Sequence, residues 1–240
     1  MFRYIVLEVR RTLRDGFFLI FGTGMPVMMY LLFTNIGGGE GVDGWKTASM
    51  VGMAAYGALG SAMSIGTGVA SDKTLGWLQQ LRVTPLAPSR AVVGRAISGS
   101  VTVLPTIVTV LLAGGLLNGV RLDAWQWIAL ALLLWIGALP FTLLGLGNGY
   151  RLTPQGTGVV NVASLMGFAI VGGLWFPLDL LPEWLRSIGR FTPANRFADL
   201  GWATTDGHAP SAGTIAVLGG WLLLFGAYAV VSYRRSARTV

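Results

Sequence analysis

Residues 125–149 read WQWIALALLLWIGALPFTLLGLGNG, a stretch that contains no charged side chain. A helix needs about 20 predominantly apolar residues to cross the hydrocarbon core of a bilayer, so this stretch is long enough to span a membrane. Five further stretches, of 20 to 28 residues, have the same character, and Arg95 is the only charged residue within them. We therefore predict an all-α polytopic membrane protein, a single domain over 1–240 with six transmembrane helices at 17–36, 47–70, 91–118, 125–149, 156–177 and 213–233.

The composition of the whole chain agrees with this fold class and excludes several kinds of site. Hydrophobic residues make up 53% of the 240 residues and charged residues only 11%, whereas a soluble domain carries about 25% charged residues. Cysteine is absent, and His208 is the single histidine. Disulfides, thiol nucleophiles, and zinc sites built from cysteine or from several histidines are therefore excluded.

The positions of lysine and arginine predict the orientation of the spans, because cytoplasmic loops are enriched in both residues. The side that carries the N-terminus holds 12 of the 17 basic residues: Arg3, Arg10, Arg11, Arg14, Lys73, Arg82, Arg90, Arg95, Arg151, Arg234, Arg235 and Arg238. The other side holds Lys46, Arg121, Arg186, Arg190 and Arg196. We expect both termini to be cytoplasmic. The net charge of +7 then reflects topology and contact with lipid, and we expect no nucleic-acid partner.

Residues 1–16 precede the first span and have the pattern of a helix that lies on the membrane surface. Apolar residues recur at helical spacing on one side: Phe2, Ile5, Val6, Val9 and Leu13. Four arginines project elsewhere, where they would contact anionic lipid headgroups: Arg3, Arg10, Arg11 and Arg14. We predict an interfacial helix along the inner leaflet. The alternative is an unstructured basic flank that only determines topology.

The loop 71–90 is the longest on the side that we expect to be cytoplasmic. Ser71 or Asp72 can cap a short helix over 73–82, and Thr84-Pro85 then ends it, because the residue before a proline avoids helical angles. The leucines of this helix recur at three-residue spacing around a tryptophan: Leu75, Leu78, Leu81 and Trp77. An apolar ridge outside the bilayer predicts a surface for a partner. The alternative is that the ridge packs against the ends of the chain's own spans.

The segment 178–212 combines apolar residues with prolines and acidic side chains. The sequence around its start reads FPLDLLPEWL at 176–185, and Thr192-Pro193 follows. This pattern predicts short re-entrant helices that enter the outer leaflet and return without crossing the bilayer, covered there by protein. Trp175 and Trp184 are typical of the aromatic belt at a membrane interface. The alternative is an ordinary structured outer loop.

The second span, 47–70, is rich in small residues that permit close helix packing. Small residues recur at a spacing of four in the pairs Gly57/Ser61, Gly60/Ser64 and Ser64/Gly68. These pairs predict close packing either within the subunit or against a second subunit.

No feature of the sequence supplies energy or chemistry for transport. The central portions of the six spans lack ionisable residues, which disfavours a proton-driven secondary transporter. Coupling to sodium through backbone carbonyls and hydroxyl groups stays an alternative. The chain also lacks the phosphate-binding pattern G-x-x-x-x-G-K-[ST] and the zinc pattern H-E-x-x-H. We therefore predict no catalytic residue, metal or cofactor in this chain. Transport against a gradient would need energy from another polypeptide, and the helix 73–82 is the natural place to receive it.

Three stretches together are similar to a known family, over nearly the whole chain. GWLQQLRVTP at 76–85 resembles the segment G-T-L-E-Q-L-x-x-T-P, and FPLDLLPEWL with the following Thr192-Pro193 resembles the pattern FPxxxLPxWL…P. The opening, from Tyr4 to Leu32-Phe33, is also similar. The chain resembles the permease subunits of type-2 ATP-binding-cassette exporters, in particular the actinobacterial drug-resistance branch typified by the daunorubicin exporter.

This resemblance implies a role for each unusual segment. The N-terminal helix would be an elbow at the inner leaflet, and the loop helix would dock into a groove on a separate cassette ATPase. Two ATPase subunits would bind ATP and Mg²⁺, and a second permease, identical or related, would complete the pathway. The implied ATPase-coupling residues are Lys73, Leu75, Gly76, Trp77, Leu78, Gln79, Gln80, Leu81, Arg82, Thr84 and Pro85. The implied outer re-entrant motif consists of Phe176, Pro177, Leu181, Pro182, Trp184 and Pro193.

The loop departs from the family pattern at three places. Trp77 stands for the threonine, Gln79 stands for the glutamate, and Thr74-Leu75 occupies a stretch that often carries an acidic residue. Docking would therefore rest on packing of Trp77 and the leucines more than on salt bridges.

The resemblance implies export across a bacterial plasma (inner) membrane by a permease that is not itself an enzyme. Span walls without fixed charge suit a hydrophobic or amphipathic substrate, such as a drug, an antibiotic or a lipid-like molecule. Two alternatives are a permease for polysaccharides or lipid-linked glycans, and a polytopic membrane protein without a transport role, such as an assembly factor or a sensor subunit.

Overall fold

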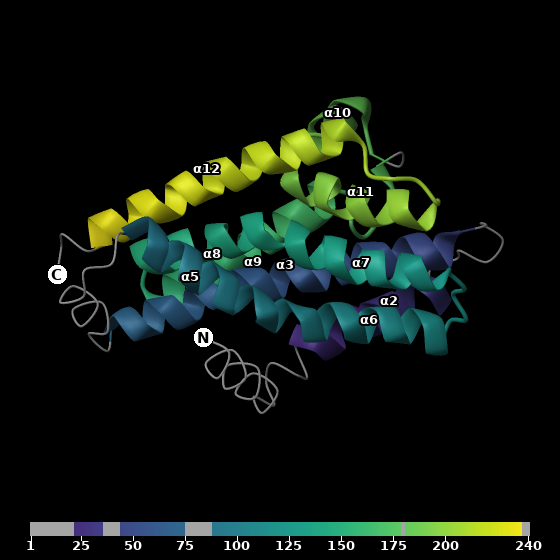
Figure 1. Ribbon diagram of the computed structural model, residues 1–240, viewed down its shortest axis with the longest axis horizontal. Helices are drawn as coiled ribbons and strands as arrows, with labels where there is room; N and C mark the ends of the chain where they lie inside the picture. The colour runs from purple at the N-terminus through teal and green to yellow at the C-terminus, as the bar shows by residue number, and fades with distance from the viewer. Residues whose placement is uncertain (1–21, 36–43, 75–87, 179–180, 237–240) are drawn as a thin grey trace.

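The structure, a computed structural model, describes residues 22–35, 44–74, 88–178 and 181–236. These residues form an elongated bundle in which most helices run along the long axis (Figure 1). In chain order the elements are α2 (Met25–Asn35), α3 (Trp45–Thr74), α5 (Pro88–Ser100), the 3-10 turn η2 (Val101–Val103), α6 (Leu104–Leu116), α7 (Ala124–Gly137), α8 (Leu139–Arg151), α9 (Pro154–Val171), α10 (Glu183–Gly189), α11 (Pro193–Thr205) and α12 (Ala212–Ser236).

Several of the predicted spans are confirmed as long apolar helices. In the described part of the chain, five helical runs are long and apolar enough to cross a bilayer: Trp45–Thr74, Val92–Leu116, Ala124–Arg151, Pro154–Val171 and Ala212–Ser236. The first predicted span, 17–36, is described only from Gly22, where a π-helical turn leads into the 11-residue α2. The count of six spans therefore stays a prediction.

The ends of α9 and α3 differ most from the sequence-based boundaries, and each has a local reason. α9 stops at Val171, before the predicted span end at 177, because Gly173 adopts a φ of +72° and the N–H of Leu174 bonds back to the carbonyl of Ala169 at 3.0 Å. α3 continues to Thr74, past the predicted end at 70. Ser71 and Asp72 therefore lie in the last turn of α3, and the prediction that one of them begins a separate helix is wrong.

α3 is the central helix of the bundle. Its residues 49–59 are all buried, and it packs against α2, α6, α8, α9 and α11. Its contact with α8 is the tightest: a Cβ on Gly66 would lie 1.9 Å from the carbonyl oxygen of Gly145, and one on Gly149 would lie 2.2 Å from the carbonyl oxygen of Gly66. Glycine allows this contact between the two backbones because it has no side chain to hold them apart.

The small-residue pairs of the second span point in two directions. Gly57 and Ser61 face inward, where the Ser61 hydroxyl hydrogen-bonds the Thr106 hydroxyl at 2.9 Å. Ser64 and Gly68 are exposed, and a Cβ on Gly68 would meet no described atom within 4 Å. The first pair therefore packs within the subunit, whereas the last pair is open to lipid or to another helix.

Candidate functional site

The connections between helices gather at the two ends of the bundle (Figure 1). At one end, which we call the basic end, α3 stops at Thr74, α8 turns into α9, and α12 finishes with Arg234 and Arg235 in its last turn. At the other end, the pocket end, lie the start of α3, the connection from α6 to α7, and α10 and α11. Each end carries side-chain contacts that bear on function.

At the basic end, Lys73 holds the C-terminal end of α8. Its Nζ donates hydrogen bonds to the carbonyl of Tyr150 at 3.2 Å and to the carbonyl of Leu152 at 2.8 Å. The last carbonyls of a helix have no partner within the helix and carry the negative end of its dipole, so an ammonium group stabilises them. The predicted coupling residue Lys73 is thus bonded inside the subunit.

An ion pair beside Lys73 joins the two helices that flank the loop. Arg95 on α5 lies 2.5 Å from the carboxylate of Asp72 on α3. α3 leads into residues 75–87 and α5 follows them, so the pair ties together the two ends of this loop. A partly exposed pair of this kind contributes on the order of 1 kcal/mol or less, so its role is to set the spacing of the helices more than to stabilise the fold.

A buried polar network lies a little deeper in the bundle. Asn148 Nδ2 donates to Asn161 Oδ1 at 2.9 Å, Asn161 Nδ2 donates to the carbonyl of Met63 at 2.8 Å, and the Tyr228 hydroxyl donates to Asn148 Oδ1 at 2.9 Å. These bonds join α3, α8, α9 and α12, and in apolar surroundings they specify how the four helices pack. This network was not predicted from the sequence. The available signal was the presence of two polar residues, Asn148 and Asn161, inside predicted spans.

Most of the predicted coupling and elbow residues lie outside the described part of the chain. These are the coupling residues Leu75, Gly76, Trp77, Leu78, Gln79, Gln80, Leu81, Arg82, Thr84 and Pro85, and the elbow arginines Arg3, Arg10, Arg11 and Arg14. Their roles stay predictions.

At the pocket end, the predicted outer motif is divided between a turn and the starts of two helices. Phe176 in the turn meets Phe33 edge-on, with ring centroids 5.4 Å apart. Two other members of the motif lie near this turn: Pro177 follows Phe176, and the N–H of Leu181 donates to the carbonyl of Leu178. The last three lie at the helices: Pro182 precedes α10, Trp184 lies on α10, and Pro193 begins α11. The segment after α9 therefore contains two short helices.

The two short helices differ in burial. α10 exposes an apolar ridge, with Trp184 at 67%, Ile188 at 54% and Phe191, just beyond its end, at 65%. α11 instead packs against α3, α7 and α12, and its Phe197 is completely buried. A Cβ on Gly137 of α7 would lie 2.7 Å from the Phe197 ring, so this glycine makes room for α11.

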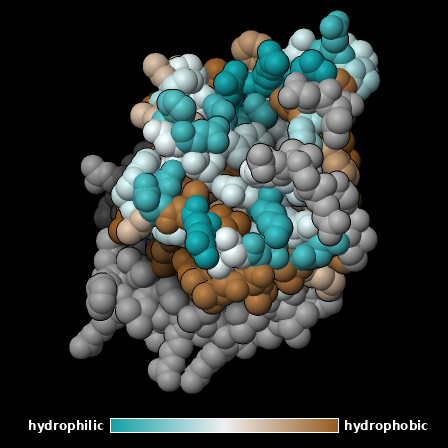
Figure 2. All heavy atoms as spheres, turned by 90° about the vertical axis from the view of Figure 1, so that its right-hand side faces the viewer, coloured by the Kyte–Doolittle hydropathy of each residue, from teal (hydrophilic) through white to brown (hydrophobic). Residues whose placement is uncertain are grey.

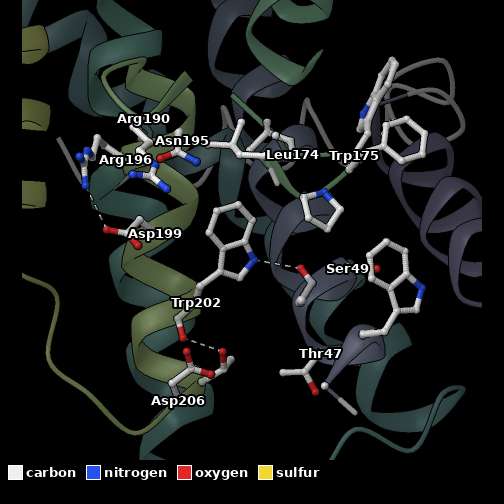
Figure 3. A pocket seen from close by; sticks show the side chains of 18 of the residues that line it. Thr47, Ser49, Leu174, Trp175, Arg190, Asn195, Arg196, Asp199, Trp202 and Asp206 are labelled. Carbon is white, nitrogen blue, oxygen red and sulfur yellow. Dashed lines mark hydrogen bonds and ion pairs between the residues drawn. The ribbon is translucent and has the colours of Figure 1, made fainter. Parts of the chain in front are cut away.

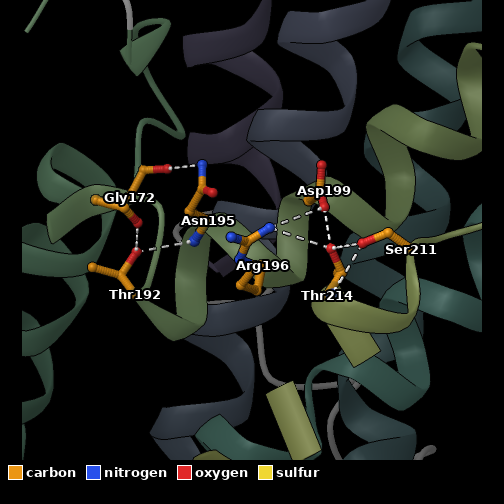
Figure 4. A network of polar contacts seen from close by, with 8 residues as sticks. Gly172, Thr192, Asn195, Arg196, Asp199, Ser211 and Thr214 are labelled. Atoms are coloured by element: carbon orange, nitrogen blue, oxygen red, sulfur yellow. Dashed lines mark hydrogen bonds and ion pairs between the residues drawn. The ribbon is translucent and has the colours of Figure 1, made fainter. Parts of the chain in front are cut away.

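Polar contacts hold α11 in place (Figure 4). Asn195 Nδ2 donates to the carbonyl of Gly172 at 3.1 Å, which joins α11 to the end of α9. Arg196 lies 3.7 Å from the carboxylate of Asp199, and that carboxylate also accepts a hydrogen bond from the Thr214 hydroxyl at the start of α12. α11 is thereby bonded to the end of α9 and to the start of α12.

A pocket of about 690 Å³ opens beside α11 (Figure 3). The start of α3, the connection around Arg121, the turn 173–178 and one side of α11 line it. Figure 2 shows that this end of the molecule gathers hydrophilic side chains, with hydrophobic residues between and around them. Among the described residues, no group of three histidine, aspartate or glutamate side chains is placed to hold a metal ion.

Comparison with known proteins agrees with the helical membrane architecture. The chain is 29% identical over 224 residues to the protein named "Putative transport permease YvfS" of Bacillus subtilis (strain 168), and the aligned region covers 92% of this chain and 91% of that protein. The sequence profile described as "ABC-2 type transporter" matches residues 4–200, which include α2 to α10 and most of α11. With this match over most of its length, the chain belongs to the ABC-2 type transporter family of membrane permeases.

Proposed function

We propose that this chain is the membrane-spanning permease subunit of an ATP-driven exporter. The observation that carries the proposal is the family match over residues 4–200. A separate cassette ATPase docks on the loop 71–90, and two copies of that ATPase bind the ATP and Mg²⁺. The positively charged basic end faces the cytoplasm of a bacterial cell, in agreement with the excess of lysine and arginine on that side.

The contacts at the basic end support a mechanical route from the docking loop into the bundle. α3 runs directly into this loop, and Lys73 in its last turn is bonded to the end of α8. Further along, the backbones of α3 and α8 touch at Gly66 and Gly145. A force on the loop would therefore move α3 and α8 together, and the network at Asn148 and Asn161 would pass the movement to α9 and α12.

A second permease, identical or related, completes the complex in this proposal. Support comes from α9, where Val159, Val162 and Ile170 are 71%, 55% and 50% exposed. α9 packs beside α3, whose Ser64 and Gly68 are open. Exposed small and β-branched residues permit close approach of a helix from another subunit.

The substrate in this proposal is hydrophobic or amphipathic, such as a drug, an antibiotic or a lipid-like molecule, as in the drug-resistance branch that the chain resembles. Spans without charged side chains in their central portions support this choice. The buried α11 and the apolar ridge of α10 support a re-entrant outer segment. The arginines of residues 1–16 contact lipid headgroups in the inner leaflet.

Replacing Trp77 with alanine tests the docking loop. We expect the variant to bind the cassette ATPase about thirtyfold more weakly, because a large aromatic at the centre of an interface contributes about 2 kcal/mol or more. The measurement is the affinity of the purified permease in nanodiscs for the ATPase subunit, with thermal unfolding as a check on the spans. Trp184→Ala, a loss of an exposed tryptophan at the pocket end, is the matched control and should bind normally. Equal affinity of the Trp77 variant and the wild type would contradict this role of the loop.

A further inference from the structure

The pocket beside α11 has the dimensions and the construction of a ligand site. Its volume of about 690 Å³ falls within the range of about 300–1,000 Å³ that is typical of small-molecule pockets. Indole hydrogen bonds fix two of its walls: Trp202 Nε1 donates to the carbonyl of Ala48 at 3.0 Å, and Trp45 Nε1 donates to the carbonyl of Phe33 at 3.2 Å. The site is therefore formed before any ligand enters.

The lining of the pocket combines apolar and polar residues, and Figure 3 shows Leu174 next to Asn195. The turn that follows α9 contributes an apolar side with Leu174, Phe176 and Pro177. Arg190 and Asn195 lie beside this turn, since Asn195 Nδ2 donates to the carbonyl of Gly172 at 3.1 Å and the neighbouring Gly189 packs against Leu178. A molecule that fills this space would need an apolar body and a polar head.

The charges of the pocket favour an anionic head. Arg196 and Asp199 neutralise each other, since they form an ion pair at 3.7 Å. Among the described residues, the side chains of Arg121 and Arg190 have no hydrogen-bond or ion-pair partner, and both are exposed to the pocket. Apart from Asp199, the described lining holds one carboxylate, that of Asp206. The two guanidinium groups of Arg121 and Arg190 therefore give the pocket an excess of positive charge. Arginine binds phosphate, sulfonate and carboxylate groups through paired N–H donors.

We propose that this pocket binds an amphipathic molecule whose anionic head pairs with Arg190 while its apolar body lies against Phe176 and Leu174, and that Arg121 adds positive charge to the pocket. Two sources can supply such a molecule, a phospholipid of the outer leaflet or another anionic amphiphile on its way out of the membrane. The exposed ridge of α10, which includes Ile188 and Phe191 on either side of Arg190, places the site beside lipid. This binding goes beyond the proposed export function and does not require the ATPase.

A pair of pyrene probes tests the charge preference. The permease in nanodiscs of phosphatidylcholine is titrated with pyrenebutyrate, an anion, and with pyrenebutanol, its uncharged counterpart, and energy transfer from tryptophan to pyrene is measured. We expect saturable binding of pyrenebutyrate, about tenfold weaker for Arg190→Gln because a hydrogen bond to a charged group is lost, and weakened to a smaller extent for Arg121→Gln. Arg190→Lys should retain part of the affinity, and Arg234→Gln at the basic end should retain all of it.

A second arm of the experiment distinguishes the two sources. If phosphatidylglycerol in the nanodisc displaces pyrenebutyrate, the site takes an anionic lipid. If the probe still binds and its binding still depends on Arg190, the site takes a different anionic amphiphile. Pyrenebutanol binding as tightly as pyrenebutyrate, or unchanged affinity of the Arg190→Gln and Arg121→Gln variants with unchanged thermal unfolding, would overturn the proposal. Because the ATPase is omitted, such a result would leave the proposed export function standing.

Discussion

Replacing Gly66 with alanine should strongly destabilise the bundle, whereas replacing Gly68 with alanine should not. A Cβ on Gly66 would lie 1.9 Å from the carbonyl oxygen of Gly145 and 2.5 Å from its carbonyl carbon, so α3 and α8 would have to separate. Overpacking of a close contact costs about 1–3 kcal/mol and sometimes more. Because two backbones must move, we expect a loss of stability at the upper end of this range. This loss corresponds to a fall in unfolding temperature of roughly 5–10 °C.

Gly68 provides the matched control, because it lies on the same helix and a Cβ there would meet no described atom within 4 Å. Alanine is also the better helix former by about 1 kcal/mol in a helix interior. The measurement is thermal unfolding of both variants in the same detergent, with gel filtration to quantify the folded fraction. Similar unfolding temperatures for Gly66→Ala and Gly68→Ala would show that the two helices do not touch through their backbones.

Replacing Lys73 with methionine should uncouple ATP hydrolysis from transport while leaving the ATPase bound. Methionine keeps much of the length of the side chain and removes the ammonium group, so the carbonyls of Tyr150 and Leu152 lose their partner. A hydrogen bond to a charged group contributes about 1.5–3 kcal/mol. α3 would then be held less firmly to the turn between α8 and α9, and we expect the transport rate per ATP hydrolysed to fall about tenfold.

Two measurements on the Lys73→Met variant separate its role in the subunit from a role in docking. The first is its affinity for the cassette ATPase, and the second is the ratio of substrate moved to ATP hydrolysed in proteoliposomes. Lys46→Met, at the exposed start of α3, is the control and should behave as the wild type. Loss of ATPase affinity in Lys73→Met would instead make Lys73 part of the docking surface, as the resemblance to the exporter family implied.

Apolar length along the chain predicted the long apolar helices well, because burial in a bilayer acts on each segment separately. α7 and α8 together cover the predicted 125–149 with a small extension at each end, and α12 does the same for 213–233. The end of α9 was predicted less well. Gly172 and Gly173 carry no charge that would mark the end of a span, and the helix ends because the backbone turns at Gly173.

Contacts between helices could not be predicted in the same way, because they depend on how each helix is rotated and which neighbour it meets. The pairs of small residues in α3 were identified from the sequence. The closest backbone contact with α8, however, is made by Gly66, which belongs to none of these pairs, and its partner Gly145 lies far away in sequence. The bonds from Lys73 to the end of α8 have the same character. The pocket combines segments from the start of α3 to the end of α11, so it has no local sequence signal.

The most direct test of the account is the rate of ATP hydrolysis by the cassette ATPase with and without this permease. Both subunits are reconstituted in proteoliposomes, and a second preparation carries a glycine-serine linker in place of residues 75–85. We predict a stable complex, hydrolysis that depends on the permease, and loss of that dependence with the linker although the bundle unfolds at the same temperature. Hydrolysis at the same rate with the wild-type permease, with the linker variant and with empty liposomes would contradict it.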